Sequence, residues 1–311
     1  MAKSLKKYCF DKYGTKYHYI NDSIMNTIVS EGDFGEDNKK IFELYHNICS
    51  NINNKKKGVV LDIGANIGSF CLPLAKKYPH ITFYAFELQK YIFLILEKNI
   101  KINNLKNIKA FNVGISNVNK KIYLNIPDYK KEMYLGSFSL EKNILHHRKV
   151  AHYNQIKEEA TLKTLDSFSF KKVDFIKSDT EMHELHVFEG AQKTIKKNNP
   201  FLIFESWPKN RTFAKKQNLH ELKIQRLLKK CNYQYFRGYR ETIAIHKNLS
   251  EKNNFEIVLF FFKKSALCDE IDFKYRYTGS LELLKKLLNQ SAKNISWRIA
   301  KALKILGEKI F

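Results

Sequence analysis

The sequence predicts an α/β protein with a doubly wound, mostly parallel sheet. The first observation is an alternation of short apolar runs with stretches of helical periodicity, which begins at Gly58, is interrupted at residues 123–163 and continues to Phe262. The second is that the first apolar run, Gly58–Ile63, ends directly in a tight turn at Gly64. A strand followed by such a turn and a helix is typical of parallel sheets that bind ligands at the carboxyl ends of their strands.

The strands are expected where a short apolar run is bounded by glycine, proline or charged residues, because a buried parallel strand is apolar on both faces. In chain order these runs are Gly58–Ile63, Ile81–Glu87, Ile108–Val113, Val173–Lys177, Phe201–Glu205, Thr242–Ile245 and Phe255–Phe262. Helical spacing of apolar residues predicts the helices Asp37–Ile52, Ser69–Tyr78, Tyr91–Asn103, Glu184–Lys197 and Leu219–Lys230. Asp37 is the expected N-cap of the first helix, and Pro79 ends the second.

Three regions of different character divide the chain of 311 residues. Residues 1–57 form a helical lead-in, residues 58–264 the α/β domain, and residues 265–311 a C-terminal helical tail with two short amphipathic helices. Within the α/β domain, Tyr123–Lys163 shows little regular pattern. Because long irregular segments inside compact domains are uncommon and often functional, we expect residues 123–163 to form a lid over the ligand site.

The composition indicates a well-packed globular protein with a strongly basic surface. Hydrophobic residues make up 44% of the chain, and 55 Lys and Arg against 31 Asp and Glu give a formal net charge of +24. Such a charge favours nucleic acid, anionic membranes and anionic substrates as partners. A general enrichment of the chain in Lys, Asn and Ile explains the same charge without any selected basic surface.

The cysteines and the apolar runs bear on the cellular compartment. Five scattered cysteines without C-x-x-C spacing indicate reduced thiols. The basic amino-terminal residues lack the apolar core of a signal peptide. The most apolar run, Phe255–Phe262, is too short to cross a bilayer. We therefore expect a cytoplasmic protein.

The turn after the first strand has the pattern Asp62-x-Gly64-x-Asn66-x-Gly68. Gly64 permits a tight turn and a close approach of a ligand to the backbone. The G-x-x-x-G spacing differs from the G-x-G-x-x-G of dinucleotide-binding turns, and it suits a ligand with a sulfonium and an amino-acid end. Asp62 is placed to hold the ammonium group of such a ligand, directly or through water. Glu87, which ends the second strand, is placed to accept hydrogen bonds from both hydroxyls of a ribose.

Several stretches of the chain together resemble the FkbM-type methyltransferases. They are Leu61–Gly68, Phe86-Glu87, Gly136-Ser137, Thr164–Asp166, Val173–Glu184 and Leu202–Glu205, and they follow the family's order from about residue 25 to residue 262. The resemblance implies a class I methyltransferase (Rossmann-like) fold with a seven-stranded sheet whose last strand is antiparallel. It also implies S-adenosylmethionine as the methyl donor and a hydroxyl acceptor on a small molecule or sugar.

By this resemblance, the cofactor contacts come from the glycine turn and from the ends of the second and third strands. The residues are Asp62, Gly64, Asn66, Gly68 and Glu87, with Asn112, Val113, Gly114 and Ile115 flanking the adenine. The chain departs from the family at Leu88, where proline is usual, and at Thr180 and Met182, where valine and glycine are usual. The last two departures bear on the shape of the acceptor pocket.

The candidates for a catalytic base follow the fourth strand, beside the expected position of the methyl group. A sugar hydroxyl is too weak an acid to ionise unaided, so its oxygen needs alignment and a base. Asp179, His183 and Glu184 lie within about one turn of each other, and Asp179 is favoured because the strand end faces the cofactor pocket. His186 is a weaker candidate. No compelling ligand set is evident, so we expect no metal; the alternative is a divalent ion held by Asp179, Glu181 and Glu184.

The lid and the tail bear on the acceptor. The lid carries the basic cluster His146–Lys149 and His152, which suits an anionic or nucleotide-linked glycan, although a solvated charged loop explains it equally. In the tail, Ile295–Ile299 resembles the ending of bacterial polysaccharide glycosyltransferases and their companions. Because a basic helix that carries Trp297 can lie on an anionic membrane face, residues 290–311 are an expected peripheral membrane contact, with an ordinary packing helix as the alternative.

We therefore expect an S-adenosylmethionine-dependent O-methyltransferase that acts on a hydroxyl of a sugar in a surface polysaccharide or glycolipid precursor. Its acceptor partner would be a glycan or a nucleotide- or lipid-linked sugar, and no specific nucleic acid is expected. RNA methylation, prompted by the net charge, is a second hypothesis. A cofactor-binding scaffold without catalytic activity is a third, prompted by Thr180 and Met182. The glycine spacing disfavours a dehydrogenase.

Overall fold

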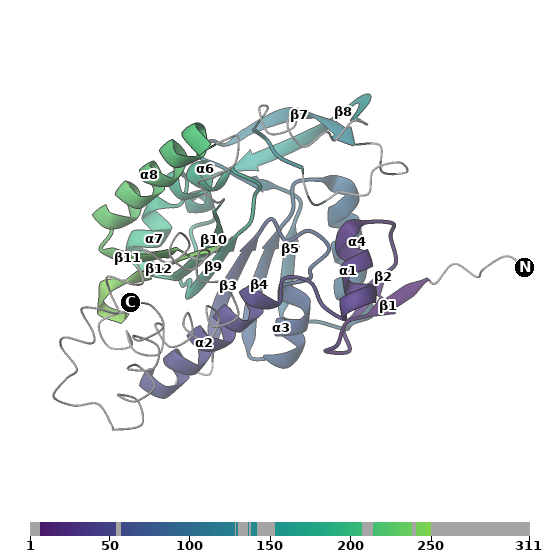
Figure 1. The fold of residues 1–311 in the computed structure, drawn as a ribbon, viewed down its shortest axis with the longest axis horizontal. Coiled ribbons are helices and arrows are strands. Elements are labelled where there is room, and N and C mark those ends of the chain that lie inside the picture. Colours follow the sequence, from purple (N-terminus) through teal and green to yellow (C-terminus); the bar gives the residue numbers. More distant parts are fainter. Residues whose placement is uncertain are drawn as a thin grey trace, which may run out of the picture.

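A computed structural model describes residues 7–53, 57–127, 129, 136, 138–141, 153–206, 214–237 and 241–249. Its main sheet contains β3 (Gly58–Ile63), β4 (Ile81–Phe86), β5 (Ile108–Phe111), β9 (Phe175–Ser178), β10 (Phe201–Glu205), β11 (Tyr233–Arg237) and β12 (Glu241–His246). The helices are α1 (Ser23–Glu31), α2 (Glu36–Asn53), α3 (Cys71–Lys77), α4 (Lys90–Ile102), α6 (Glu184–Glu189), α7 (Gln192–Asn198) and α8 (Ala214–Lys230). Figure 1 shows these helices arranged around the central sheet.

The seven strands of the main sheet lie in the order β11-β12-β10-β9-β3-β4-β5. The pairs β3–β4, β4–β5, β3–β9 and β9–β10 are parallel. β12 is antiparallel to both of its neighbours, β10 and β11, so among the described strands of this sheet only β12 runs against the others. The predicted doubly wound sheet with an antiparallel last strand is confirmed.

The apolar strands of this sheet bury side chains on both faces, as their sequences predict. On one face, Val60 and Phe83 pack with Phe42 of α2 and with the residues of α3. On the other face, Leu61 and Ile63 pack with the residues of α6 and α8. The two clusters hold the strands from opposite sides, and the carboxyl ends of β3, β4 and β9 remain at one edge.

The amino-terminal region adds a short hairpin of β1 (Tyr8–Phe10) and β2 (Lys16–His18), followed by α1. This part lies against α4, where Met25 and Ile28 of α1 pack with Ile92 and Ile95. Asp37 is the second residue of α2 and not its N-cap, because the helix begins one residue earlier, at Glu36. The predicted N-cap is therefore wrong, although an acidic side chain in the first turn still suits the helix dipole.

The end of the sheet differs from the prediction. We expected the final pair of strands at Thr242–Ile245 and Phe255–Phe262, but β12 pairs with β11, at Tyr233–Arg237. The prediction missed β11 because its pattern is short and aromatic, and because the longer apolar run downstream gave a stronger signal. That downstream run, with the whole tail from residue 265, lies outside the described residues.

Both ends of the predicted irregular segment are strands. β7 (Lys120–Pro127) and β8 (Tyr153–Lys163) pair antiparallel, and the short β6 (Gly114–Ile115) pairs with β8 to complete a sheet in the order β6-β8-β7. The prediction was wrong here because it overlooked a strand signal in β7, where Ile122, Leu124 and Ile126 alternate with exposed residues. The basic cluster at 146–149 and His152 lie outside the described residues.

The predicted helix over Glu184–Lys197 is divided into α6 and α7 by a break at Gly190-Ala191. A Cβ added at Gly190 would come within 2.0 Å of the Ser116 carbonyl oxygen, so the backbone passes too close to its neighbour for any other residue. No helix in the described part of the chain is long and apolar enough to cross a membrane.

Candidate active site

A cavity opens at the carboxyl ends of β3, β4 and β9, the edge at which open α/β sheets bind their ligands. Ile63 of β3 pairs with Phe86 of β4 and with Ser178 of β9, so the residues that follow these three strands meet at one edge of the sheet. The cavity wall includes Gly64, Asn66, Glu87, Val113, Gly114, Phe138, Leu140, Asp179, Thr180, Glu181 and His183. The predicted cofactor turn and the favoured base therefore share one cavity.

The turn after β3 requires glycine at position 64. Gly64 has a φ of +75°, and a Cβ built there would lie 1.9 Å from the carbonyl oxygen of Asp179. The backbone N–H groups of Gly64 and Ala65 both donate to the carbonyl oxygen of Phe86, at 3.0 Å. These contacts hold the turn tightly between β4 and the end of β9. Gly64 itself lines the cavity.

Gly68 permits close packing between the turn and α3. Its φ is +93°, and a Cβ there would collide with the Leu72 side chain at 1.5 Å. Gly68 does not line the cavity, so it serves the packing of α3 against the turn. The predicted contact of Gly68 with the cofactor stays a prediction.

Glu87 is buried at the base of the cavity and holds the turn. Its Oε2 accepts a hydrogen bond from the backbone N–H of Asn66 at 3.0 Å, and its Oε1 accepts one from the N–H of Gln89 at 2.8 Å. Burial raises the pKa of the Glu87 carboxyl to about 7, against the lowering effect of these two hydrogen bonds. A carboxylate has about four lone-pair sites, so two remain to accept the hydroxyls of a ribose.

Asn112 stabilises the turn after β4 without lining the cavity. Its Nδ2 donates to the carbonyl oxygens of Glu87 and Leu88, at 2.9 and 3.0 Å. Val113 and Gly114 line the cavity, whereas Asn112 does not. The side chain of Asn112 thus keeps the turn after β4 in place, where the family usually has a proline in the position of Leu88.

Asp62 is fully buried behind the turn and not on the cavity wall. Its Oδ1 lies 3.1 Å from Nζ of Lys177, a buried lysine that also donates to the carbonyl oxygen of Gly64 at 3.0 Å. Burial alone would lower the pKa of Lys177, but the negative charges of Asp62 and Asp179 raise it overall. Asp62 therefore holds the turn through Lys177, and its contact with a bound ammonium group stays a prediction.

Asp179 and Glu184, two of the predicted catalytic residues, lie in different environments. The Asp179 side chain is 38% exposed on the cavity wall, with its Oδ2 3.6 Å from Nζ of Lys177. Glu184 is buried and does not line this cavity; its Oε1 accepts hydrogen bonds from the N–H and Oγ1 of Thr180, at 2.8 and 2.9 Å. Burial raises the pKa of Glu184 to about 7. Through its hydrogen bonds to Thr180, Glu184 stabilises the turn between β9 and α6.

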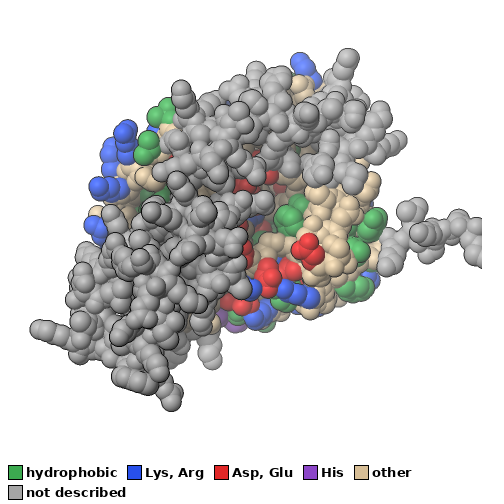
Figure 2. All heavy atoms as spheres, viewed as in Figure 1, with side chains coloured by type: hydrophobic (Ala, Val, Ile, Leu, Met, Phe, Trp, Pro, Cys, Tyr) green, Lys and Arg blue, Asp and Glu red, His purple; other side chains and the backbone are tan. Residues whose placement is uncertain are grey.

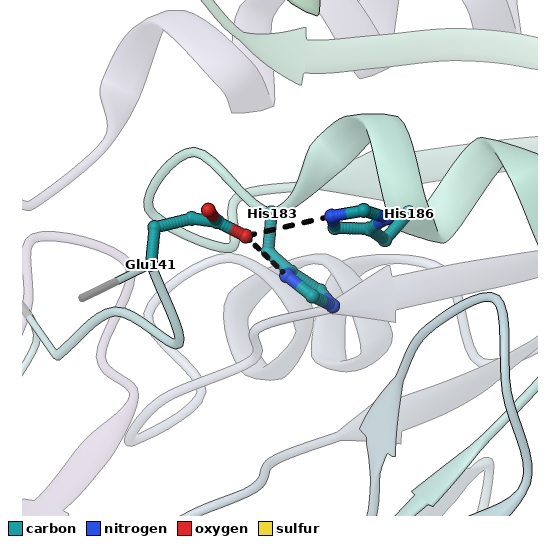
Figure 3. Close-up of side chains that lie close together, drawn as sticks. All are labelled: Glu141, His183 and His186. Atoms are coloured by element: carbon teal, nitrogen blue, oxygen red, sulfur yellow. Dashed lines mark hydrogen bonds and ion pairs between the residues drawn. The ribbon is translucent and has the colours of Figure 1, made fainter. Parts of the chain in front are cut away.

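The third candidate, His183, lines the cavity, but both of its ring nitrogens have partners. Nδ1 lies 3.2 Å from Oε1 of Glu141, and Nε2 lies 3.0 Å from Oγ of Ser116. Figure 3 shows the Glu141 carboxylate directed at both His183 and His186, with His186 Nε2 at 3.5 Å. The hydrogen bond from His183 lowers the pKa of Glu141, against the raising effect of burial.

The three carboxylates named as an alternative metal site do not form one group in the described residues. Asp179 and Glu181 converge with Glu205 at the end of β10, while Glu184 is absent from that group. Glu205 ends an apolar strand in the sequence, so its position beside Asp179 follows only from the parallel pairing of β9 with β10.

Sequence reasoning missed two residues of this site. Lys177 could have been identified, because a lysine within an otherwise apolar strand needs a buried acidic partner. Glu141 gave no such signal. It comes from a loop 42 residues before His183 in the sequence, and only the tertiary structure brings the two together.

The cavity fits S-adenosylmethionine, the cofactor that the resemblance implies. Gly64 lines the cavity with its backbone, so a ligand can approach the turn without meeting a side chain at this position. Glu87 offers its remaining acceptor sites to a ribose, and Val113, Gly114 and Ile115 supply a wall for an adenine. Among the residues of the structure, these would hold the cofactor.

Comparison with known proteins agrees with this geometry. Residues 62–235 match the methyltransferase FkbM domain. The chain is 25% identical to methyltransferase 1 of Beauveria bassiana over 142 residues, which cover 42% of this chain and 57% of that protein. It is 26% identical to methyltransferase sdnD of Sordaria araneosa over 196 residues, or 53% of this chain and 73% of that protein. The first match thus spans little more than half of its relative.

Among solved structures, the FkbM methyltransferase of Methylobacillus flagellatus KT aligns with a TM-score of 0.43 and 14% identity. The alignment covers 61% of this chain and 44% of that one. The FkbM match extends over more than half of the chain, and it spans the glycine turn, Glu87 and Asp179. The protein is therefore a member of the FkbM family of S-adenosylmethionine-dependent methyltransferases, with the class I fold.

Proposed function

We propose that the protein is an O-methyltransferase that transfers a methyl group to a hydroxyl of a sugar in a surface polysaccharide or glycolipid precursor. The observation that carries the proposal is the position of Asp179. Its carboxylate is partly exposed on the wall of the cavity that contains the cofactor turn, and it directly follows β9. A carboxylate at this place is available to a substrate, whereas Glu184 and His183 are engaged elsewhere.

The chemistry follows from these positions. S-adenosylmethionine supplies, when bound, an activated methyl group. The turn at Gly64 and the carboxylate of Glu87 bind and orient the cofactor at the base of the cavity. Asp179 would accept the proton of the acceptor hydroxyl as that oxygen takes the methyl group, and its Oδ2 lies 3.6 Å from Nζ of Lys177. General base catalysis of this kind contributes about 10²–10⁴-fold to a rate.

The acceptor class is supported by charge. α8 exposes four basic side chains, Lys223, Arg226, Lys229 and Lys230. Figure 2 shows Lys and Arg side chains in blue at the edge of the molecule where α8 lies in Figure 1. A positively charged surface favours acceptors that carry phosphate, as nucleotide- and lipid-linked sugars do.

The experiment that tests the proposal is a survey of acceptors. The protein and S-adenosylmethionine are incubated with free, nucleotide-linked and lipid-linked sugars, and S-adenosylhomocysteine release is measured together with the mass of the product. Turnover with one sugar class and the gain of a methyl group on oxygen would support the proposal. Turnover with RNA alone would favour RNA methylation, which the net charge of +24 suggests as the second candidate. Tight cofactor binding without turnover on any acceptor would favour a non-catalytic scaffold.

RNA binding needs a control for charge. A basic protein binds RNA through its phosphates, and such binding weakens steeply as salt rises. An RNA affinity that falls steeply between about 50 and 200 mM salt would therefore indicate that the protein binds RNA through charge alone. Methylation of a defined nucleotide that persists across this range would report recognition.

Glu87 is expected to make cofactor affinity depend on pH. Its pKa of about 7 means that the carboxyl gains a proton as the pH falls through neutrality, and the protonated form loses an acceptor site for the ribose hydroxyls. The dissociation constant of S-adenosylmethionine should therefore rise by about tenfold from pH 8 to pH 6. Isothermal titration calorimetry at several pH values measures this.

Two variants isolate the contribution of Glu87 to that pH dependence. Glu87→Gln keeps the shape of the side chain but cannot titrate, so its affinity should lose this part of the pH profile. Glu87→Ala should weaken binding at pH 8 by about 1–3 kcal/mol, the scale of hydrogen bonds to a charged group. Affinity equal to the wild type in both variants would rule out the ribose contact.

We also propose that the protein is cytoplasmic and that residues 290–311 contact the anionic inner face of a membrane. The basic residues and Trp297 of this segment support the proposal. Deleting residues 290–311 is expected to release the protein from anionic vesicles in a sedimentation assay while leaving turnover in solution unchanged. Neutral vesicles serve as the control, and equal sedimentation of the truncated and full-length proteins would refute the contact.

A further inference from the structure

We propose that Glu141, His183 and His186 form a binding site for a divalent transition-metal ion of the Zn²⁺ class, beside the cofactor cavity. One donor atom from each of the three side chains lies within 4.8 Å of the other two. The inference does not depend on the acceptor proposed above, because it concerns a different set of side chains and a different ligand.

The spacing of the donor atoms suits a tetrahedral ion. Bonds of about 2.0–2.2 Å to histidine nitrogen and carboxylate oxygen place neighbouring ligand atoms about 3.3–3.5 Å apart. Oε1 of Glu141 lies 3.2 Å from Nδ1 of His183 and 3.5 Å from Nε2 of His186. Figure 3 shows the carboxylate of Glu141 facing both imidazole rings.

The outer contacts of both histidines suit metal ligands as well. A histidine that binds a metal through one nitrogen usually has a hydrogen-bond partner on the other, which sets its tautomer and its orientation. Nε2 of His183 lies 3.0 Å from Oγ of Ser116, and Nδ1 of His186 lies 3.2 Å from Oε2 of Glu189. In each ring the nitrogen nearer to Glu141, which is Nδ1 of His183 and Nε2 of His186, is therefore the one placed to bind the metal ion.

The donor types identify the class of ion. Two imidazoles and one carboxylate suit Zn²⁺ and its first-row neighbours, whereas Mg²⁺ and Ca²⁺ prefer oxygen ligands alone. Three protein ligands leave further positions open to water or to another group, as in zinc sites that are not closed. The side chains are also partly withdrawn from solvent, with exposed fractions of 18% for Glu141, 9% for His183 and 31% for His186.

The position of the site suggests what the ion does. Glu141 belongs to the loop that supplies Phe138 and Leu140 to the cavity wall, and His183 lines the same cavity from the start of α6. An ion bound to all three ligands would fasten this loop to α6. The part of the cavity wall formed by Phe138 and Leu140 would then be held in one conformation.

The test uses the full-length protein after removal of metal by a chelator, and it titrates Zn²⁺ alone by calorimetry. We expect one Zn²⁺ per chain. Glu141→Gln and His186→Ala should each weaken Zn²⁺ binding by more than the 10–100-fold typical of outer contacts, and Ser116→Ala by an amount within that range. Cobalt(II) should give visible absorption bands with the wild type that these ligand variants lose.

Control variants separate the site from other metal-binding groups. His80→Ala removes an exposed histidine elsewhere, and Glu205→Gln removes a carboxylate from the group that includes Asp179 and Glu181. Neither control should change the affinity for Zn²⁺. Unchanged S-adenosylmethionine affinity in the ligand variants would show that they are folded.

A second measurement needs no variant, in case the ligand variants do not fold. Zn²⁺ should protect His186 of the wild-type protein from diethyl pyrocarbonate, as read by mass spectrometry, and leave the reactivity of His80 unchanged. Absence of stoichiometric Zn²⁺ binding, or binding that survives in folded Glu141→Gln and His186→Ala, would overturn the proposal. The three side chains would then form only an ion-pair network.

Discussion

Replacing Asp179 by asparagine is expected to lower kcat by about 10²–10⁴-fold, because the amide cannot accept the proton of the acceptor hydroxyl. The cofactor affinity should change much less. The Asp179 side chain is 38% exposed, so the loss of its charge near a bound sulfonium is worth about 1 kcal/mol or less after solvent screening. Steady-state kinetics with the identified acceptor, together with calorimetry for the cofactor, measures the two effects separately.

Glu181→Gln is the matched control for Asp179→Asn. It removes a negative charge from the same cavity wall, so it reports the effect of charge without the proposed base. We expect its turnover to fall far less than that of Asp179→Asn. Normal turnover in Asp179→Asn, or an equal loss in both variants, would exclude Asp179 as the base.

Replacing Gly64 by alanine is expected to abolish cofactor binding. The added Cβ would lie 1.9 Å from the carbonyl oxygen of Asp179, so either the turn after β3 or the end of β9 must move. Movement of the turn would also disturb the two N–H groups that donate to Phe86 and the contact of Asn66 with Glu87. A displacement of about 1 Å in a positioned site can cost on the order of 100-fold, so we expect at least that loss of S-adenosylmethionine affinity by calorimetry.

Gly35→Ala supplies a matched control for Gly64→Ala. Gly35 has a similar φ of +71°, but a Cβ there meets nothing within 4 Å. The control therefore carries the backbone strain alone, about 1–2 kcal/mol of unfolding free energy, and should leave cofactor affinity unchanged. Denaturant unfolding gives the stability of both variants. Cofactor affinity in Gly64→Ala that matches the wild type would contradict the close packing described for the turn.

Much of the main sheet could be predicted from the sequence because its strands are buried on both faces. Such strands are continuous apolar runs, and Gly58–Ile63 and Phe201–Glu205 begin and end in the structure where they were expected. The small sheet of β7 and β8 could not be predicted in the same way. Its strands are buried on one face only, so their apolar residues alternate with exposed ones, as Ile122 and Leu124 do with Tyr123, and no continuous apolar run marks them.

The residues of the site also divide into those whose position could be predicted from the sequence and those whose position could not. The turn at Gly64, the carboxylate of Glu87 and the base candidate Asp179 each directly follow a strand, and parallel strands bring their carboxyl ends to one edge. Their meeting in one cavity was therefore predictable. The packing contacts of Asp62, Gly68, Asn112 and Glu184 were not, because sequence position does not say whether a residue lines the cavity or packs behind it.

The sequence by itself determined the fold class and the family, since apolar runs, glycine spacing and acidic strand ends are local features of the chain. Only the tertiary structure decided which side chains are free to act. It engages Glu184 with Thr180, buries Asp62 against Lys177, and brings Glu141 from a separate loop to His183 and His186. Such contacts depend on where each element packs in three dimensions, and no spacing along the chain encodes them.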